Sequence, residues 1–155
     1  MTRRGYFKIR EIAPDPKYND SMVAKFVNQL MHDGKKTVAY KVFYKTLDKL
    51  SQNGENGVEV FKKAIDNVSP TIGTKMKRIG GAVIQIPSEI RKEKQISLAM
   101  KWIIEIARKR SEKTMVEKLY KEITDAANNE GGAIKKKTDK QKMASSNKVF
   151  ATLNF

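Results

Sequence analysis

Apolar side chains recur every three or four residues over most of the chain, which is the spacing of one face of an α-helix. The segments with this period lie at 19–34, 35–50, 56–69, 88–110 and 114–127. Two of them open on capping-box pairs, Asn56 with Glu59 and Thr114 with Glu117, whose side chains satisfy free amides at a helix start. The pattern therefore predicts five helices whose apolar faces share one core.

Between residues 71 and 87 the period shortens to two. Apolar and polar residues alternate on both sides of Gly80-Gly81, and this arrangement predicts a β-hairpin. An isolated two-stranded hairpin is only marginally stable in water, so it has to lean on helices or on a partner. Lys75 and Lys77 fall on the same face of the first strand, and we expect that face to stay outside the core.

Both ends of the chain lack a strong apolar period. Pro14 and Pro16 preclude a regular helix in the basic N-terminal arm. The tail contains six lysines and few apolar residues, so even if it is helical we expect only a partner to order it. The predicted fold is mainly α, a five- to six-helix domain with one protruding β-hairpin. The expected organisation is a single domain, 1–155, with the arm at 1–18, the helical core at 19–130, the hairpin near 71–87 and the tail at 131–155.

The net charge of the chain indicates the kind of partner that this fold binds. The 155 residues include 32 Lys and Arg against 17 Asp and Glu, a formal charge of +15. Such a field attracts nucleic acids, anionic membranes or acidic proteins. The cations gather at termini, turns and helix ends, whereas a membrane binder would place them along one face of an amphipathic helix with aromatic residues opposite. A nucleic acid is therefore the favoured partner, and a generic polyanion binder with a membrane or acidic-protein partner is the alternative.

The candidate nucleic-acid-binding residues are lysines, which supply mainly salt-sensitive phosphate contacts, and arginines, which add planar bidentate ones. They are Arg3, Arg4, Lys8, Arg10, Lys35, Lys36, Lys75, Lys77, Arg78, Arg91, Arg108, Lys109, Arg110, Lys113, Lys135, Lys136 and Lys137. Trp102 lies just off the apolar stripe of its predicted helix. We interpret it as a core anchor rather than as a platform on which a base stacks.

The sequence indicates no catalytic chemistry. The chain has no Cys and a single His, His32, so transition-metal and thiol sites lack ligands. No Gly-rich phosphate-binding motif is present. Acidic residues such as Asp48, Glu122 and Asp125 have lysines at helical spacing, and we interpret them as a solvated charged face. No apolar run is long enough to span a membrane, and the N-terminus lacks the apolar core of a secretory signal. We predict no enzyme activity, cofactor, metal ion or small-molecule substrate.

Several long blocks of the sequence match a known pattern in order and spacing. They are PDPKYND (14–20), VAKFVNQLMHDGKK (23–36), NVSP (67–70), KRIGGAVIQIP (77–87), KWIIEIARKRSEKTM (101–115), DAANNEGGAIKKK (125–137) and MASSNKVF (143–150). On these blocks the chain resembles, from end to end, the bacterial-type ribosomal protein seven family of the small subunit.

The resemblance implies a function as well as a fold. It implies a structural protein that binds the 3′ major domain of 16S rRNA as a primary binder, nucleates assembly of the 30S head and lies at the subunit interface near the tRNA exit site. The implied partners are 16S rRNA, exit-site tRNA, mRNA and the neighbouring proteins of the head and platform, without a membrane. The implied location is the ribosome in the cytoplasm, with an organellar ribosome left open.

The chain departs from the usual family pattern in the hairpin and the tail. The hairpin reads GTKMKRIGG where the family usually has a sequence like EVRSRRVGG, so Lys77 stands at a common arginine position. The tail reads DKQKMASSNKVF where DTHRMAEANKAF is usual. Lysine does not reproduce the planar donor geometry of arginine. We therefore expect the detailed contacts of the hairpin and tail to differ from those of the family.

Overall fold

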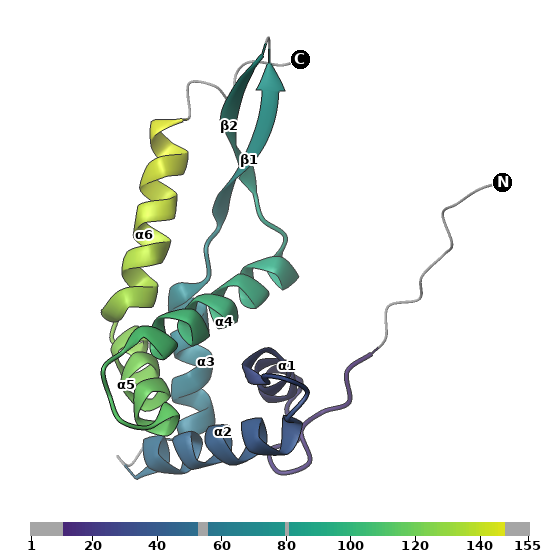
Figure 1. Ribbon diagram of the computed structural model, residues 1–155, viewed down its shortest axis with the longest axis vertical. Coiled ribbons are helices and arrows are strands. Elements are labelled where there is room, and N and C mark those ends of the chain that lie inside the picture. Colours follow the sequence, from purple (N-terminus) through teal and green to yellow (C-terminus); the bar gives the residue numbers. More distant parts are fainter. Residues whose placement is uncertain (1–10, 53–55, 80, 148–155) are drawn as a thin grey trace, which may run out of the picture. The chain divides into compact units, whose positions relative to one another are not determined.

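The structure is a computed structural model of the chain, and it describes residues 11–52, 56–79 and 81–147 (Figure 1). Its elements are α1 (Ser21–Leu30), α2 (Lys36–Ser51), α3 (Gly57–Val68), β1 (Ile72–Ile79), β2 (Ala82–Glu89), α4 (Lys92–Lys109), α5 (Met115–Ala127) and α6 (Gly131–Ser146). This order confirms the predicted, mainly α fold with one hairpin. The chain forms two compact units, Met1–Tyr40 and Lys41–Phe155, and α2 begins in the first and continues into the second.

The first unit contains α1 and the turns on either side of it. Asp20 caps the helix, because its side chain accepts a hydrogen bond of 2.7 Å from the amide of Met22. The apolar face of α1 is buried, as the period predicted, and consists of Val23, Ala24, Phe26, Val27 and Leu30. The helix ends at Leu30, four residues before the predicted stop at Gly34. The chain turns there through Asp33 and Gly34, which both have positive φ.

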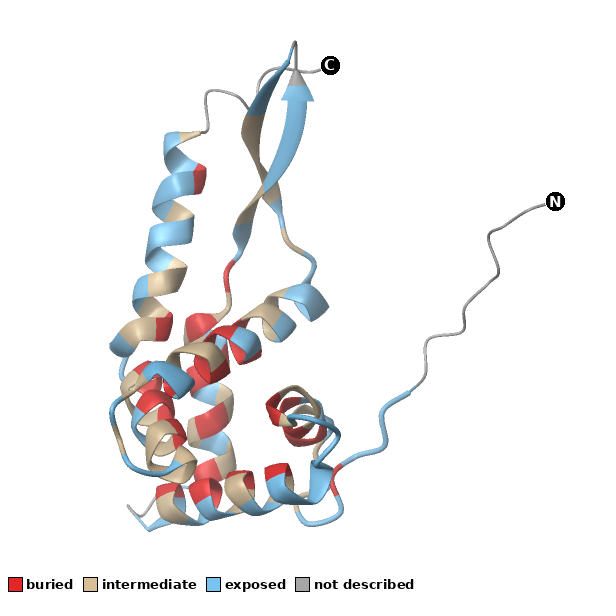
Figure 2. Ribbon diagram, in the orientation of Figure 1, coloured by how far each residue is buried: buried red, intermediate tan, exposed pale blue. Residues whose placement is uncertain are grey.

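The core of the second unit lies where α3, α4 and α5 pack against one another. Their buried residues face inward in Figure 2, and the largest of them include Phe61, Ile65, Ile103, Leu119 and Ile123. The rings of Phe43 and Phe61 meet edge to face, with centroids 5.1 Å apart. Full burial of each such side chain contributes about 1.5–3 kcal/mol relative to leaving it in water. This core is the platform from which the hairpin and α6 extend.

The predicted helix starts at Asn56 and Thr114 are confirmed. The Asn56 side chain accepts from the amide of Val58 at 3.1 Å, and the Thr114 hydroxyl accepts from the amide of Glu117 at 3.3 Å. The start of α4 was predicted too early. It begins at Lys92 rather than at residue 88, because β2 continues pairing as far as Glu89.

The hairpin is antiparallel, and its register runs from Ile72 opposite Glu89 to Ile79 opposite Ala82. Gly81 in the turn has a φ of +90°, a conformation that glycine adopts without strain. The strands project beyond the ends of α3 and α4, and α6 runs alongside them (Figure 1). Because α6 contacts both strands, the hairpin has the helical support that a two-stranded ribbon needs.

The prediction that only a partner orders the tail is wrong for 131–146. These residues form α6, which packs against α3, α4, α5 and the hairpin. Its apolar pattern is thin because the contact is made by small residues, and both Ala133 and Ala144 are buried. A Cβ atom on Gly132 would lie 2.6 Å from Cγ2 of Ile106, so the helix approaches α4 as closely as a glycine allows. Within the described residues, no helix is both long and apolar enough to cross a membrane.

Candidate nucleic-acid interface

An ion-pair cluster around one buried carboxylate holds the start of α6 in place. Glu122 on α5 has a fully buried side chain, and one of its oxygens accepts a hydrogen bond of 2.7 Å from Nε of Arg110. Its other oxygen accepts from the backbone amide of Ala133 at 2.9 Å. Arg110 also pairs through Nη2 with Asp125. Glu122 thus serves as a remote cap for α6, whose own N-cap residue, Glu130, makes no side-chain cap bond.

This cluster corrects the interpretation of Glu122 as part of a solvated charged face. Lysines at helical spacing are present, but the residue that neutralises Glu122 comes from the end of α4, twelve positions earlier. Burial acts to lower the pKa of Arg110, yet its hydrogen bonds to Asp125 and Glu122 outweigh burial and raise that pKa above the ordinary value. The guanidinium therefore stays charged. Arg110, a candidate RNA contact, has a structural role inside the protein.

Two lysines of α6 also bind within the protein. Lys136 donates to Glu105 on α4 at 2.6 Å, and Lys137 donates to the backbone oxygen of Asn67 at 2.5 Å. The Asn67 amide in turn donates to the carbonyl oxygens of Ala126 and Ala127, both at 3.0 Å. Asn67 therefore links the end of α3 to α5 and α6. The bonds of Lys136 and Lys137 hold α6 against α4 and α3. Other lysines of α6, such as Lys135 and Lys140, are exposed.

Trp102 is a core anchor, as predicted, with only 8% of its surface exposed. The ammonium of Lys136 lies 6.0 Å from the centre of its ring, within the range of a cation–π contact. The ring is thus held between the core and α6 and does not project as a stacking platform.

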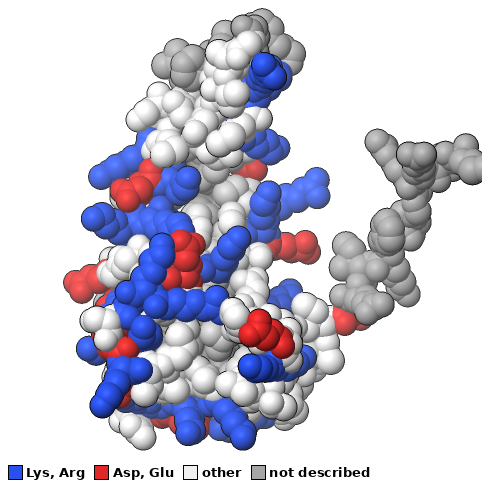
Figure 3. Space-filling view, in the orientation of Figure 1, with Lys and Arg blue, Asp and Glu red and all other residues white. Residues whose placement is uncertain are grey.

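The basic side chains of the hairpin and its base are exposed, whereas Arg110 of the ion-pair cluster is bound within the protein. Lys75, Lys77 and Arg78 on β1 and Arg91 before α4 are all exposed. Lys75, Arg78 and Arg91 form no ion pair with any other described residue, so their charges are available to an external anion. In Figure 3, blue Lys and Arg side chains predominate over the face that carries α4, α6 and the lower part of the hairpin. This face is the candidate interface.

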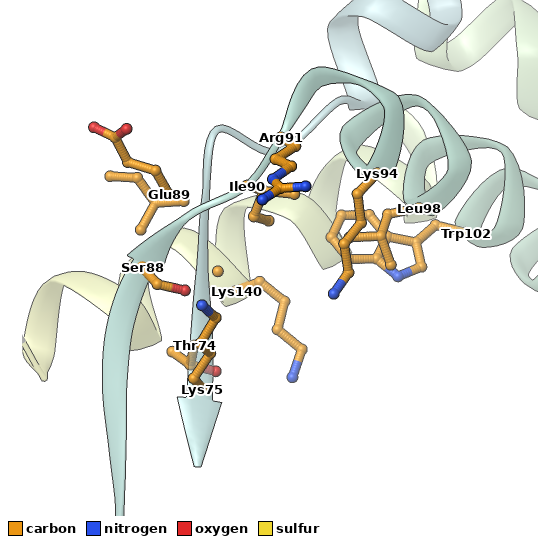
Figure 4. Close-up of a pocket in the computed structure, with 12 residues that line it drawn as sticks. Thr74, Lys75, Ser88, Glu89, Ile90, Arg91, Lys94, Leu98, Trp102 and Lys140 are labelled. Atoms are coloured by element: carbon orange, nitrogen blue, oxygen red, sulfur yellow. The ribbon is translucent and has the colours of Figure 1, made fainter. Parts of the chain in front are cut away.

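A pocket lies at the base of the hairpin, between the two strands, the first turns of α4 and the side of α6 (Figure 4). It has a volume of about 580 Å³, and we call it the hairpin-base pocket. Its lining consists of Ile72, Gly73, Thr74, Lys75, Ser88, Glu89, Ile90, Arg91, Lys94, Leu98, Trp102 and Lys140. Lys94 and Lys140 were not among the candidates. Their juxtaposition depends on the path of α6 along the hairpin, which the sequence pattern did not predict.

The other candidates lie at separate places. Lys35, just before α2, and Lys36, its first residue, are exposed in the first unit, and the Lys36 ammonium lies 5.6 Å from the ring centre of Tyr40. The last turn of α4 presents Arg108 and Lys109, and the connection to α5 presents Lys113. All three are exposed, and Lys109 pairs with Glu105 at 3.1 Å. Lys135 is exposed on α6. The arm residues Arg3, Arg4, Lys8 and Arg10 lie outside the described residues.

No group of three or more His, Cys, Asp or Glu with metal-binding geometry occurs in the part of the chain that the structure describes. His32 is exposed and pairs only with its neighbour Asp33, at 2.9 Å. The hairpin-base pocket contains one carboxylate, Glu89, among four basic side chains. Its composition suits binding of an anion rather than acid–base chemistry.

Comparisons with known proteins identify the family of the chain. The family described as ribosomal protein S7p/S5e matches residues 2–148. The chain belongs to this family. It is 51% identical, over 152 residues and 97% of each chain, to the small ribosomal subunit protein uS7 of Nitratidesulfovibrio vulgaris strain DP4. It is 48% identical, over 157 residues and the full length of both chains, to the protein of the same name from Salinibacter ruber.

Membership confirms the resemblance found in the sequence. The S7p/S5e family consists of ribosomal proteins, so the chain is a structural protein of the small ribosomal subunit rather than an enzyme. Its place is the ribosome, and its partners are rRNA and other ribosomal proteins.

Replacing Arg110 with Met tests the cluster. The variant leaves the carboxylate of Glu122 buried without its partner, and we expect it to lower the free energy of unfolding by about 3–5 kcal/mol. The double variant Arg110→Met, Glu122→Met removes both buried charges and should recover part of that loss. Urea unfolding followed by circular dichroism measures both. Lys113→Met, at an exposed position without an ion pair, is the control, and an Arg110 variant as stable as this control would contradict the account.

The pKa of Glu105 tests how α6 is fastened to α4. The hydrogen bond from Lys136, with a smaller one from Lys109, holds the pKa of Glu105 below its ordinary value. The stabilisation that this carboxylate gives the fold is therefore present above its unfolded-state pKa and is lost as pH falls through the lowered pKa. In a carbon-13 NMR titration, Lys136→Met should raise the pKa of Glu105. Lys135→Met should leave it unchanged, and equal effects of the two would refute the proposed contact.

Proposed function

We propose that this protein binds the 3′ major domain of 16S rRNA as a primary binder and nucleates assembly of the head of the 30S subunit. In this proposal it lies at the subunit interface near the tRNA exit site, with the hairpin directed toward exit-site tRNA and mRNA. Its other neighbours are small-subunit proteins of the head and platform. Family membership supports the assignment, and the distribution of basic residues supports the mode of binding.

One observation carries the proposal. The basic residues of the second unit divide into cations that bind within the protein and cations that do not. Arg110, Lys136 and Lys137 make internal bonds that fasten α6 to the core. Lys75 and Arg78 stand on a hairpin that projects from the helices and have no acidic partner among the described residues. Cations of the second kind add little to the stability of the fold, and a polyanion explains their concentration on one projecting element.

The geometry favours recognition of a folded RNA through its shape and phosphates. The two strands form a ribbon only two chains wide, and the basic side chains of β1 extend along it. Side chains cannot read the deep, narrow major groove of A-form RNA, so specificity has to come from shape, from unpaired nucleotides and from the arrangement of phosphates. Cations at the hairpin, its base and the start of α5 can contact phosphates of different RNA segments at once.

Binding measurements with a charge-matched control test this function. Replacement of Lys75, Lys77 and Arg78 with Ala should weaken binding to a 3′-domain rRNA fragment by more than about tenfold and lower the slope of log K against log salt by roughly two to three. It should leave the helical circular dichroism unchanged. The control replaces three exposed lysines of α2 and α3, Lys41, Lys45 and Lys63, and removes the same charge. Hydroxyl-radical footprints should disappear only next to the hairpin.

Two outcomes would contradict the proposal. Equal affinity of the unaltered protein for the 3′-domain fragment and for an unrelated folded RNA of the same length would show a generic polyanion binder. Equal losses for the hairpin variant and the α2–α3 control would show that net charge alone determines binding.

A further inference from the structure

The hairpin-base pocket carries an inference beyond phosphate binding, and it rests on the proposed RNA-binding function. Four basic side chains from three parts of the fold line the pocket: Lys75 from β1, Arg91 and Lys94 from just before and within the first turn of α4, and Lys140 from α6. None of them forms an ion pair with another described residue, and Glu89 is the only acidic residue of the lining. Figure 4 shows the ammonium groups of Lys94 and Lys140 on the same side of the pocket. An anionic group at this place would meet several cations at once.

Four apolar residues, Ile72, Ile90, Leu98 and Trp102, also line the pocket. We call Ile90, Leu98 and Trp102 its floor. The backbone of Ile90 is fixed on both sides, because its amide donates to Thr71 at 3.2 Å and its carbonyl oxygen accepts from the Gln95 side chain at 2.6 Å. The floor is therefore formed before any ligand arrives.

Gly73 keeps the floor in position. A Cβ atom on Gly73 would lie 2.8 Å from Cδ1 of Ile90, so a larger residue would displace the isoleucine side chain. The absence of a side chain on Gly73 lets Ile90 lie against β1 instead of filling the space above it. Such a preformed apolar surface beside cations is suited to a ligand that has both a flat apolar part and a negative charge.

Two hydroxyl groups in the wall have no partner within the described part of the chain. Thr74 and Ser88 both line the pocket, on β1 and β2. Elsewhere, serine and threonine hydroxyls on helices donate to the carbonyl four residues earlier, as those of Thr46, Ser51 and Thr124 do. The hydroxyls of Thr74 and Ser88 make no such bond. Each can therefore donate to or accept from the polar edge of a ligand.

We propose that the hairpin-base pocket binds one unpaired nucleotide of RNA. The base lies on the side chains of Ile90 and Leu98, beside the buried Trp102, the hydroxyls of Thr74 and Ser88 contact its polar edge, and the adjoining phosphate lies among Lys75, Lys94 and Lys140. A volume of about 580 Å³ is in the range of pockets for small organic ligands. A paired base inside a duplex cannot reach the floor, so the nucleotide comes from a bulge, a loop or a single strand.

The single tryptophan of the chain, Trp102, reports directly on the pocket. Titration with each of the four ribonucleoside monophosphates should quench its fluorescence to saturation, with at least one of them half-saturating at millimolar concentration, about −4 kcal/mol. Inorganic phosphate and an oligo-aspartate peptide are the comparison probes and should not saturate over the same range. Saturation by phosphate alone, equal binding of the acidic peptide, or no saturation by any nucleotide would overturn the proposal.

A pair of variants separates the pocket from the general positive field. Ser88→Phe places an aromatic ring in the pocket and changes no charge, and it should weaken nucleotide binding by at least about tenfold. Val83→Phe is the matched control, because Val83 is exposed on the same strand and does not line the pocket. It should change the affinity by less than about twofold. Equal effects of the two variants would refute the assignment of the site.

Base-specific chemical modification of the bound 3′-domain rRNA tests the pocket proposal independently of the proposed rRNA-binding function. In the complex with the unaltered protein, one unpaired base should be protected. In the complex with Ser88→Phe, that base should become reactive while the phosphate footprint of the hairpin remains. If the rRNA binds specifically but no base loses protection in the variant, the pocket proposal fails and the proposed function stands. If the rRNA does not bind specifically, the proposed function fails whatever the pocket binds.

Discussion

The buried carboxylate of Glu122 determines where α6 begins, and the arrangement of the basic surface depends on this. Its two oxygens bind Arg110 at the end of α4 and the amide of Ala133 at the start of α6, so one side chain of α5 joins three helices. Asn67 makes a second junction between α3, α5 and α6. Breaking such a buried pair is costly because the remaining charge stays desolvated. The helix that supports the hairpin is therefore fixed by polar contacts, with small residues at the points of close approach.

This arrangement divides the positive charge of the protein into two kinds. Arg110, Lys136 and Lys137 hold the helices together, whereas Lys75, Arg78 and Lys140 face solvent along the hairpin and α6. Arg110, Lys136 and Lys137 fix the position of α6, and this position places Lys140 beside the cations of the hairpin. Lys140 lines the hairpin-base pocket only because α6 lies beside the strands. A preorganised set of cations needs less ordering when RNA binds than a mobile tail would.

The local elements of the fold could be predicted from sequence because their signals are local. The apolar periods, the caps at Asn56 and Thr114 and the period of two around Gly81 each depend on neighbouring residues. The role of Glu122 could not be predicted, because a carboxylate among lysines reads as a solvated face until the distant arginine is placed. The tail was misjudged for a related reason: a helix that packs through glycine and alanine shows almost no apolar stripe. The pocket, in turn, depends on both of these long-range features.

Amide hydrogen exchange of the RNA-free protein tests most directly whether α6 is built into the fold before RNA arrives. The amide of Ala133, which donates to the buried Glu122, and the interior amides of α6 should be protected to a degree approaching those of α5. Exchange throughout α6 at the rate of an unfolded chain, while α5 stays protected, would contradict the account. It would show that the lysines of the helix reach the hairpin only when a partner orders them.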